Sequence, residues 1–203
     1  PVRRLRVGGV GTNATATNGY CKIFESNNAT DGVNWEMVHQ EEFDGDLSSA
    51  PITIRNLNGD KDVLYILRLN GYSKTAADNT FIINMRFNDD AGTNYRQQCH
   101  NESAALHSYV SSDLDALFKT ETRLSANGMN LEMLICAKSG TYRRAIWSMA
   151  NLNTGNGPRL LLGGSWWKNT TDNLRTITIA KDAGTYSTAR IVLQLYKWKG
   201  PLI

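Results

Sequence analysis

Between residues 61 and 88, apolar side chains recur at every second position in two separate runs. The first run is KDVLYILRLNGY (61–72), and the second is TFIINMRFN (80–88). A period of two places alternate side chains on opposite faces, so each run predicts a β-strand with one apolar face. The segment between them, SKTAADN, contains residues that are common in turns. We therefore expect two neighbouring strands at the centre of one sheet.

The same alternation predicts strands along most of the chain after residue 34. In the first of these, NWEMVHQEEF, Trp35, Met37 and His39 are expected on one side. The further expected strands cover 51–57, 95–97, 130–139, 141–151, 159–169, 174–180 and 189–198. About ten strands and very little helix, with turn residues at the spacing seen here, are typical of a β-sandwich or a β-barrel.

Several short segments punctuate these strands. Asn58-Gly59 is a strong hairpin signal, and Ser139-Gly140 is a tight turn between two strand patterns. Gly163-Gly164 inside a strand pattern predicts a bulge or a bend. FDGDLSSA (43–50) reads as a turn or loop, and SDLDALF (112–118) is the one candidate for a helical turn.

The bulk composition is that of one globular domain. The chain has 203 residues, of which 41% are hydrophobic and 20% charged. A formal net charge of +3 is too small to indicate nucleic-acid or membrane binding. No run of about 18 apolar residues predicts a membrane span. We expect no membrane partner and no specific nucleic acid.

The first twenty residues differ from the rest. Arg3, Arg4 and Arg6 lie close together and precede three glycines, Gly8, Gly9 and Gly11. Dense glycine disfavours a fixed conformation. We therefore expect a flexible basic N-terminal arm over 1–20, followed by a single β-sandwich domain over 21–203. The arm is either a terminus without a role or a tether to an acidic or neighbouring surface.

The sequence contains little that predicts catalysis. Cys21, Cys99 and Cys136 form no CxxC pair, so we expect unpaired thiols that pack as small hydrophobic side chains. Cys99-His100 could suggest a nucleophile and its base, but no strained elbow or GxSxG motif accompanies it. No pair of carboxylates stands out as an acid and a base. We predict a protein that is not an enzyme and has no cofactor.

An acidic segment offers oxygen ligands for a calcium ion. Asn88, Asp89, Asp90 and Asn94 lie close together, but their spacing does not match a calcium-binding loop. Asn and Asp are common in turns, so a solvated turn at a strand end is the better interpretation. A second acidic group, Glu42, Asp44 and Asp46, is interpreted in the same way. We predict no metal site.

The aromatic residues near the C-terminus are the most informative set. Trp166 and Trp167 are adjacent in a predicted strand, so one should enter the core and the other should reach the surface. A surface tryptophan can stack on a sugar or join a subunit contact. Interface cores favour Trp and Arg, which makes a subunit contact the preferred hypothesis. The predicted interface residues are Arg3, Arg4, Arg6, Arg143, Arg144, Trp166, Trp167 and Trp198.

The order of several motifs resembles a group of tailed-bacteriophage virion proteins. The motifs are Trp35 with a following Glu, PITIRNLNGDKDVLYILRLNGY, RFNDDAGTNY, MLICAKSG, WWKNTTDNLRTITI and TARIVLQLYKW. The resemblance covers about residues 34–198. The chain departs from it at Thr188-Ala189, where a Gly-Ser pair is common, and at its Lys197-Trp198-Lys199 end.

The resemblance implies an antiparallel β-sandwich of the jelly-roll type, found in head decoration or tail appendages. The expected function is therefore that of a capsid cement or decoration protein, which forms a homotrimer and contacts the major capsid protein or another virion protein. It would be made in the host cytoplasm and located on the virion, on the capsid surface or tail. The alternatives are a tail appendage that recognises a host-surface glycan and a carbohydrate-binding module.

Overall fold

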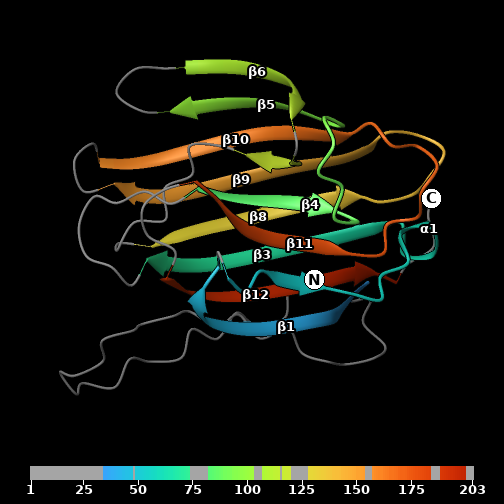
Figure 1. Ribbon diagram of the computed structural model, residues 1–203, viewed down its shortest axis with the longest axis horizontal. Coiled ribbons are helices and arrows are strands. Elements are labelled where there is room, and N and C mark those ends of the chain that lie inside the picture. The colour runs from blue at the N-terminus through green and yellow to red at the C-terminus, as the bar shows by residue number, and fades with distance from the viewer. Residues whose placement is uncertain are drawn as a thin grey trace, which may run out of the picture. The chain divides into compact units, whose positions relative to one another are not determined.

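The computed structural model describes residues 34–47, 49–73, 82–102, 107–114, 116–119, 128–153, 157–183 and 188–199. These ranges belong to one compact unit, Asn34–Ile203. The predicted arm 1–20, and residues 21–33 of the predicted domain, lie outside the described residues. Over the described ranges the chain forms twelve strands and a single short helix (Figure 1).

Two antiparallel sheets contain all of these strands. The large sheet has eight strands in the order β1-β12-β3-β8-β9-β10-β5-β6, and the small sheet has four in the order β2-β11-β4-β7. The strands of the large sheet are β1 (Trp35–Asp46), β12 (Thr188–Trp198), β3 (Leu64–Ser73), β8 (Met129–Cys136), β9 (Arg143–Asn153), β10 (Gly157–Trp167), β5 (Tyr95–Glu102) and β6 (His107–Leu114). The strands of the small sheet are β2 (Ile52–Ile54), β11 (Ile177–Ala183), β4 (Ile82–Phe87) and β7 (Phe118–Lys119).

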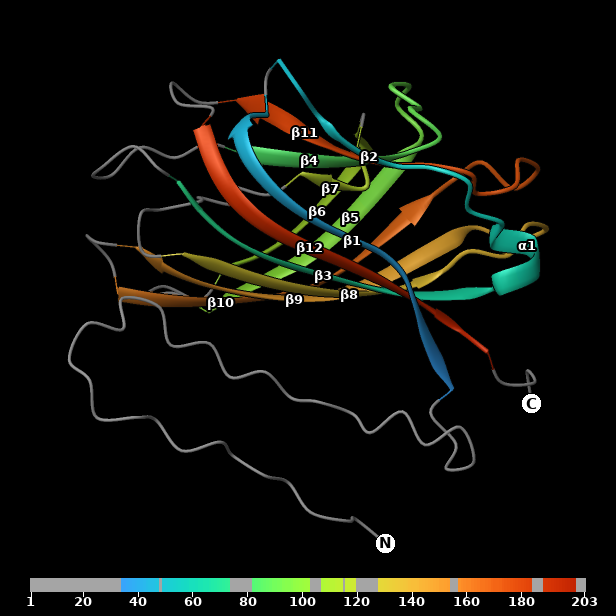
Figure 2. The same cartoon turned by 90° about the horizontal axis from the view of Figure 1, so that it is seen from below.

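The strand order is that of a jelly roll. The four strands β1-β12-β3-β8 and the small sheet form the jelly-roll frame, and the chain crosses between the two layers in the steps β1–β2–β3–β4 and again in β7–β8 and β11–β12 (Figure 2). Two further pairs, β5–β6 and β9–β10, extend the large sheet beyond this frame. The predicted all-β sandwich is confirmed. The strands not expected from the alternation are β6 and β7, whose sequences lack a clear period of two.

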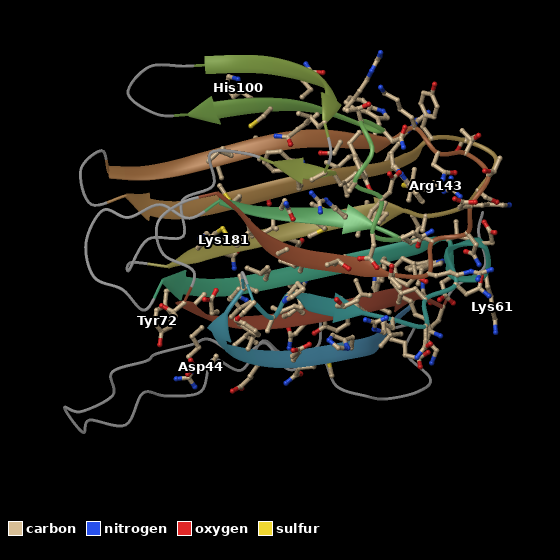
Figure 3. The ribbon with its side chains drawn as sticks, in the orientation of Figure 1. Asp44, Lys61, Tyr72, His100, Arg143 and Lys181 are labelled. Carbon is tan, nitrogen blue, oxygen red and sulfur yellow. The ribbon has the colours of Figure 1, made fainter. Side chains whose placement is uncertain are left out.

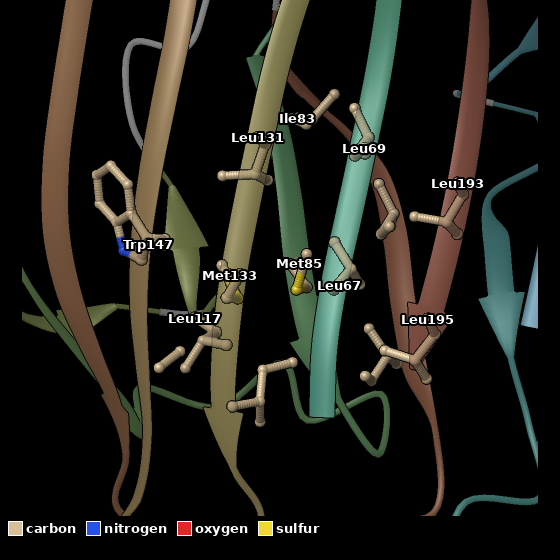
Figure 4. Packing of buried hydrophobic residues seen from close by; sticks show 14 of the residues in the cluster. Leu67, Leu69, Ile83, Met85, Leu117, Leu131, Met133, Trp147, Leu193 and Leu195 are labelled. Atoms are coloured by element: carbon tan, nitrogen blue, oxygen red, sulfur yellow. The ribbon is translucent and has the colours of Figure 1, made fainter. Parts of the chain in front are cut away.

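The two alternating runs, 61–72 and 80–88, do not form neighbouring strands. β3 pairs with β12 and β8 in the large sheet, whereas β4 pairs with β11 and β7 in the small sheet. Their apolar faces meet across the core, as Leu67 and Met85 illustrate (Figure 4). The prediction of adjacent strands was wrong because alternation determines which face is apolar, but not which strand becomes the partner.

Asn58-Gly59 does not form a hairpin. It begins α1 (Gly59–Asp62), a single helical turn in which the Asn58 side chain accepts a hydrogen bond of 3.2 Å from the Lys61 amide. This turn carries the chain from β2 in one sheet to β3 in the other. Gly59 is required there, because a Cβ atom would lie 2.8 Å from both the Ala137 carbonyl oxygen and Leu174 Cβ.

Three smaller predictions are also corrected. β1 continues to Asp46, so the loop expected over 43–50 begins later, and residues 112–114 belong to β6 rather than to a helical turn. The register of β1 shifts between Met37 and His39, so they lie opposite the adjacent residues Tyr196 and Leu195 and do not share a face. The bulge, which supplies one extra residue, is typical of an edge strand.

The turn at Ser139-Gly140 is confirmed, but the connection is longer than the tight turn predicted, since it covers 137–142. It joins β8 to β9, which pair in an antiparallel register without a shift. Gly140 has a φ of +89°, a left-handed conformation that favours glycine.

The core lies between the sheets and is built from the inward residues of both. The large sheet supplies residues such as Leu67, Leu131 and Trp147, and the small sheet supplies Ile83 and Met85 (Figure 4). Burial of each such side chain stabilises the fold by about 1.5–3 kcal/mol relative to its exposure to water. The fold is therefore held mainly by this apolar layer.

One polar link also crosses the core. The Tyr95 hydroxyl of β5 accepts from the Phe87 amide of β4 at 3.0 Å and donates to the Phe87 carbonyl oxygen at 3.2 Å. Burial raises the pKa of Tyr95, so the phenol remains protonated and able to donate.

Candidate functional site

Two adjacent glycines in β10 shape both faces of the large sheet. Gly163 faces the core, where a Cβ atom would lie 2.2 Å from Cζ2 of Trp147. The missing side chain lets the Trp147 ring lie flat against the strand, and its indole Nε1 donates to Ser165 Oγ at 3.0 Å. No bulge forms, since β10 pairs with β9 and β5 without a register shift. The predicted bulge is therefore replaced by a close approach of an aromatic ring.

Gly164 faces outwards and leaves a hollow in the surface of the sheet. A Cβ atom there would have ordinary contacts only, at 3.8 Å from the Ala145 carbonyl oxygen and 4.0 Å from Cη2 of Trp166. The open hollow has a volume of about 600 Å³ and lies over β5, β8, β9 and β10. Its apolar lining includes Leu134, Ile146, Leu162 and Trp166, and its polar lining includes Gln98, His100, Glu132 and Ser148. Figure 3 places His100 on β5, at one side of this region.

The hollow lies at the end of a row of outward apolar side chains that crosses the sheet. Neighbouring members of this row are opposite each other in the strand register: Met37, Tyr196, Ile66, Leu134 and Ile146, followed by Gly164. We call these five side chains the apolar row. The row crosses from β1 to β9, a span of about 19 Å at a strand spacing of roughly 4.8 Å. The exposed fractions of Met37, Leu134 and Ile146 are 50%, 36% and 67%.

A polar row runs beside the apolar row. Gln194 donates to Gln40 at 3.3 Å, and Arg68 Nε donates to Glu132 Oε2 at 2.7 Å. The Arg68 guanidinium also lies 5.5 Å from the Tyr196 ring centroid. These polar groups bond to one another within the sheet, so they border the apolar row, and only Arg68 lies over one of its members, Tyr196. Contiguous exposed apolar surface with a polar border is typical of an interaction site.

The predicted tryptophan pair divides as expected, with Trp167 buried and Trp166 half-buried at the hollow. The Trp167 ring contacts Phe87 edge-on, with a centroid distance of 5.7 Å, and its Nε1 donates to Asp90 Oδ2 at 2.7 Å. Trp167 therefore stabilises the fold and does not present its side chain to a partner, which corrects its place among the predicted interface residues.

Arg143 is the second correction. It was expected at the surface, but it is buried opposite Trp167, with its guanidinium 5.0 Å from that ring (Figure 3). Its Nη1 donates to the Asn169 carbonyl oxygen. Burial lowers the pKa of Arg143. Arg143 faces inwards because it lies opposite Trp167, which is buried. Residues opposite each other on paired strands share a face.

The remaining interface candidates are dispersed. Arg144 is exposed on β9 and lies opposite Trp166 in the strand register, and Trp166 lines the hollow. Trp198 packs edge-on against Trp35, with ring centroids 5.2 Å apart, and β3, β8 and β9 separate β12 from β10. Trp198 is therefore not part of the hollow.

The predicted basic arm cannot be placed in this surface. Its arginines, Arg3, Arg4 and Arg6, lie outside the described residues.

The acidic segment after β4 is a turn, as interpreted from the sequence. Asn88 Oδ1 accepts from the amides of Arg175 and Thr176 at 2.8 and 3.1 Å. Asp90 accepts from the Gly92 amide at 2.9 Å and from Trp167. Burial alone would raise the pKa of Asp90, but these hydrogen bonds outweigh it and lower the pKa.

The acidic residues of this turn are not part of a metal-binding group among the described residues. Across the described part of the chain, no group of three or more His, Cys, Asp or Glu side chains is placed to hold a metal ion. Glu42, Asp44 and Asp46 of the second acidic group lie in β1.

The cysteines lie in different environments. Cys99 is buried and Cys136 is exposed, and neither forms a disulfide within the described ranges. Cys99 thus packs as a small hydrophobic side chain as expected, whereas Cys136 does not, and Cys21 lies outside the described residues. The Cys99 thiol lies 3.7 Å from the backbone carbonyl oxygen of His100. The side chains of Cys99 and His100 point to opposite faces of β5, because the two residues are adjacent in the strand. They therefore do not form a nucleophile–base pair.

The fold thus defines an all-β protein of the jelly-roll type, and the comparisons with known proteins add nothing more specific. No family model matches the chain, and no curated protein matches it. The solved structures include one weak neighbour, a protein of unknown function from Shewanella oneidensis MR-1, with 8% identity and a TM-score of 0.19 over 89% of this chain and 85% of that one. That similarity carries no argument. Within the described ranges, no helix is long and apolar enough to cross a membrane.

Proposed function

We propose that this protein is a non-enzymatic structural protein of a bacteriophage virion, a capsid cement or decoration protein that assembles with copies of itself through the outer face of the large sheet. The observation that carries the proposal is the apolar row, three of whose five side chains, Met37, Leu134 and Ile146, are exposed in the single chain. Jelly rolls are used by viral capsid proteins and by lectins, so the fold agrees with this function and with the glycan-binding alternative. The motif order from Trp35 to Trp198 supports the virion assignment.

Assembly would work by removal of apolar surface from water. The favourable free energy is about 25 cal/mol for each Å² of apolar surface buried, and a standard interface buries roughly 1,600 Å² in total. Arg144 and Trp166 stand at the end of the apolar row, and both residue types are enriched at interfaces. In this proposal the basic arm extends the contact to a neighbouring copy or to the major capsid protein.

A glycan-binding appendage is the second candidate, because Trp166 lies in a hollow together with His100 and Gln98. A sugar site needs the flat face of an aromatic ring with polar groups around it. Within the described ranges, the most exposed large hydrophobic side chain is the aliphatic Ile146, with 67% of its surface accessible. An aliphatic side chain gains more from contact with another apolar surface than from contact with a hydroxylated ring, which favours a protein partner.

The first experiment measures the mass of the full chain by sedimentation at several concentrations. We expect oligomers, with three copies as the number predicted from the resemblance, and Ile146→Lys should shift them to monomers. The matched control is Tyr72→Lys, which adds the same charge at an exposed aromatic residue near the far end of β3 (Figure 3). A wild-type chain that stays monomeric at every concentration would overturn the proposal.

The second experiment tests the place on the particle. The protein should copurify with phage heads, and removal of residues 1–20 should weaken that attachment. Binding of the wild-type chain to a polysaccharide array, lost in Trp166→Ala, would instead support the appendage. Trp167→Ala is not informative here, because Trp167 is part of the core.

A further inference from the structure

The geometry points to a two-fold contact in which two large sheets pack outer face against outer face, with Ile146 of each copy seated over the Gly164 hollow of the other. This inference rests on the proposed function, since it requires self-association through that face. A two-fold contact pairs two copies, and it is compatible with the three-fold symmetry predicted from the resemblance only within a hexamer. The inference adds this symmetry and the residues that meet in the contact.

A knob and a hole lie side by side on this surface. Among the large hydrophobic side chains that the structure describes, Ile146 is the most exposed, and its cross-strand neighbour is Gly164, which has no side chain. A two-fold interface is self-complementary, so residue i of one copy contacts residue j of the other, and j contacts i. An exposed isoleucine next to a glycine hollow meets that condition, because one rotation fills both hollows.

The required axis runs parallel to the strands, between β9 and β10. Rotation about it places β9 of one copy over β10 of the other, and β8 over β5. Because the axis is parallel to the strands, residues that lie opposite each other in one sheet stay at the same height along the strands in both copies. At the level of Trp166, its neighbour Arg144 then lies over Trp166 of the second copy. One level beyond Ile146, Glu132 of β8 lies over His100 of β5.

These pairs are complementary in character. An arginine over the face of a tryptophan makes a favourable cation–π contact. A carboxylate facing an imidazole can accept a hydrogen bond from it. The alternative two-fold axis, which crosses the strands at Ile146, would set isoleucine against isoleucine and leave both hollows empty. Two packed sheets lie at roughly 30° to each other, because each sheet is twisted. Strands far from the axis therefore diverge, and the contact is centred on β9 and β10.

Replacement of Gly164 provides the first test. The monomer has room for a side chain at this position, since the nearest atoms to a Cβ lie at 3.8 and 4.0 Å. Gly164→Val should therefore leave the melting curve of the monomer unchanged or raise its midpoint, because valine suits a strand. The dissociation constant of the wild-type assembly, measured by sedimentation, should rise at least about tenfold, with a smaller rise for Gly164→Ala.

A mixed disulfide provides the second test. Cys21 and the exposed Cys136 are first replaced by serine, and Ile146→Cys and Gly164→Cys are then made in separate chains that carry different tags. Oxidation of an equal mixture should give a covalent heterodimer on a non-reducing gel. Each variant alone should give little covalent dimer, because the axis brings residue 146 to residue 164 and not to itself.

The outcomes separate this inference from the proposal beneath it. A wild-type chain that never associates overturns both. A wild-type oligomer that is weakened by Ile146→Lys, but not by Gly164→Val, and that forms no mixed disulfide overturns the two-fold contact alone. A strict trimer without the mixed disulfide has the same meaning, whereas a dimer, or a hexamer with the mixed disulfide, agrees with the inference.

Discussion

The two faces of β10 use the same residue types for opposite purposes. On the inner face, Gly163 admits the ring of Trp147, and Trp167 is buried. On the outer face, Gly164 leaves a hollow, and Trp166 stays half-buried beside it. The members of each pair are adjacent in β10, and successive side chains of a strand point to opposite faces. That single step along the strand decides whether a residue faces the core or the solvent. Residue type alone therefore does not distinguish a core residue from a surface residue here.

The comparison also extends to the charged groups. The outer pair Arg68–Glu132 has side chains that are 48% and 51% exposed, whereas Arg143 is buried against Trp167. The inner face should thus dominate the stability of the single chain, and the outer face should dominate its association.

The tryptophan pair should give the largest contrast. Trp167→Ala removes a buried ring that contacts Phe87 and donates to Asp90, so we expect a loss of about 3–5 kcal/mol in the free energy of unfolding. Trp166→Ala should lose less than about 1 kcal/mol, since its ring is partly in water. Urea unfolding followed by circular dichroism measures both under conditions where the chain is monomeric. Equal losses would mean that the two faces are not distinguished.

The glycine pair should give the next contrast. Gly163→Ala places a methyl group 2.2 Å from Trp147 Cζ2, and the overpacked core should lose about 1–3 kcal/mol. Gly164→Ala meets no close atom and replaces the most flexible residue, so its effect should lie between neutral and a gain of about 1 kcal/mol. Urea midpoints compare the two directly. A stable Gly163→Ala variant would show that Trp147 can move at little cost.

The contribution of Asp90, in the turn after β4, to the pH dependence of stability should be smaller than the effects of the core substitutions. The pKa of Asp90 is lowered in the folded chain, so its contribution to stability is present above its unfolded pKa of about 3.9 and is lost as the pH falls through the folded value. Asp90→Asn should therefore flatten the loss of stability below about pH 4. Thermal melts between pH 2 and 6 measure the slope.

Asp60 serves as the comparison for this slope. Hydrogen bonds from Ser139 lower its pKa, so Asp60→Asn should also remove part of the dependence. An unchanged slope in Asp90→Asn would contradict the assigned role of the Trp167 hydrogen bond.

The exposed ion pair should have the smallest effect. Glu132→Gln breaks the charge pair with Arg68 but keeps a polar side chain, and exposed pairs contribute about 0.2–1 kcal/mol. We expect a change of this size in the urea midpoint of the monomer, which should shrink further in high salt. A loss comparable to that of Trp167→Ala would show that the outer face stabilises the single chain.

Local pattern was sufficient for several features. The alternation predicted the strands and the inward faces of β3, β4 and β8, and Ser139-Gly140 predicted the turn before β9. It also predicted that one tryptophan of the pair would be buried. These features depend on neighbours in the sequence, whose side-chain directions follow from the backbone geometry of a strand.

The apolar row was missed, although a sequence signal for it existed. In β8 the outward positions change from Asn130 and Glu132 to Leu134, so both faces of its second half are apolar. Such a departure from clean alternation marks an outward apolar residue. It does not show that Leu134 lies next to Ile66 and Ile146, because these residues come from separate strands.

The sequence by itself determined that this protein is an all-β chain, which residues of β3, β4 and β8 face its core, and that a tryptophan would reach the surface. Only the tertiary structure decided that β3 and β4 lie in opposite sheets, that Arg143 is buried, and that side chains from β1, β12, β3, β8 and β9 line up as one row. The physical reason is that a period of two specifies a face, whereas the choice of strand partner depends on how distant segments bury their apolar faces together.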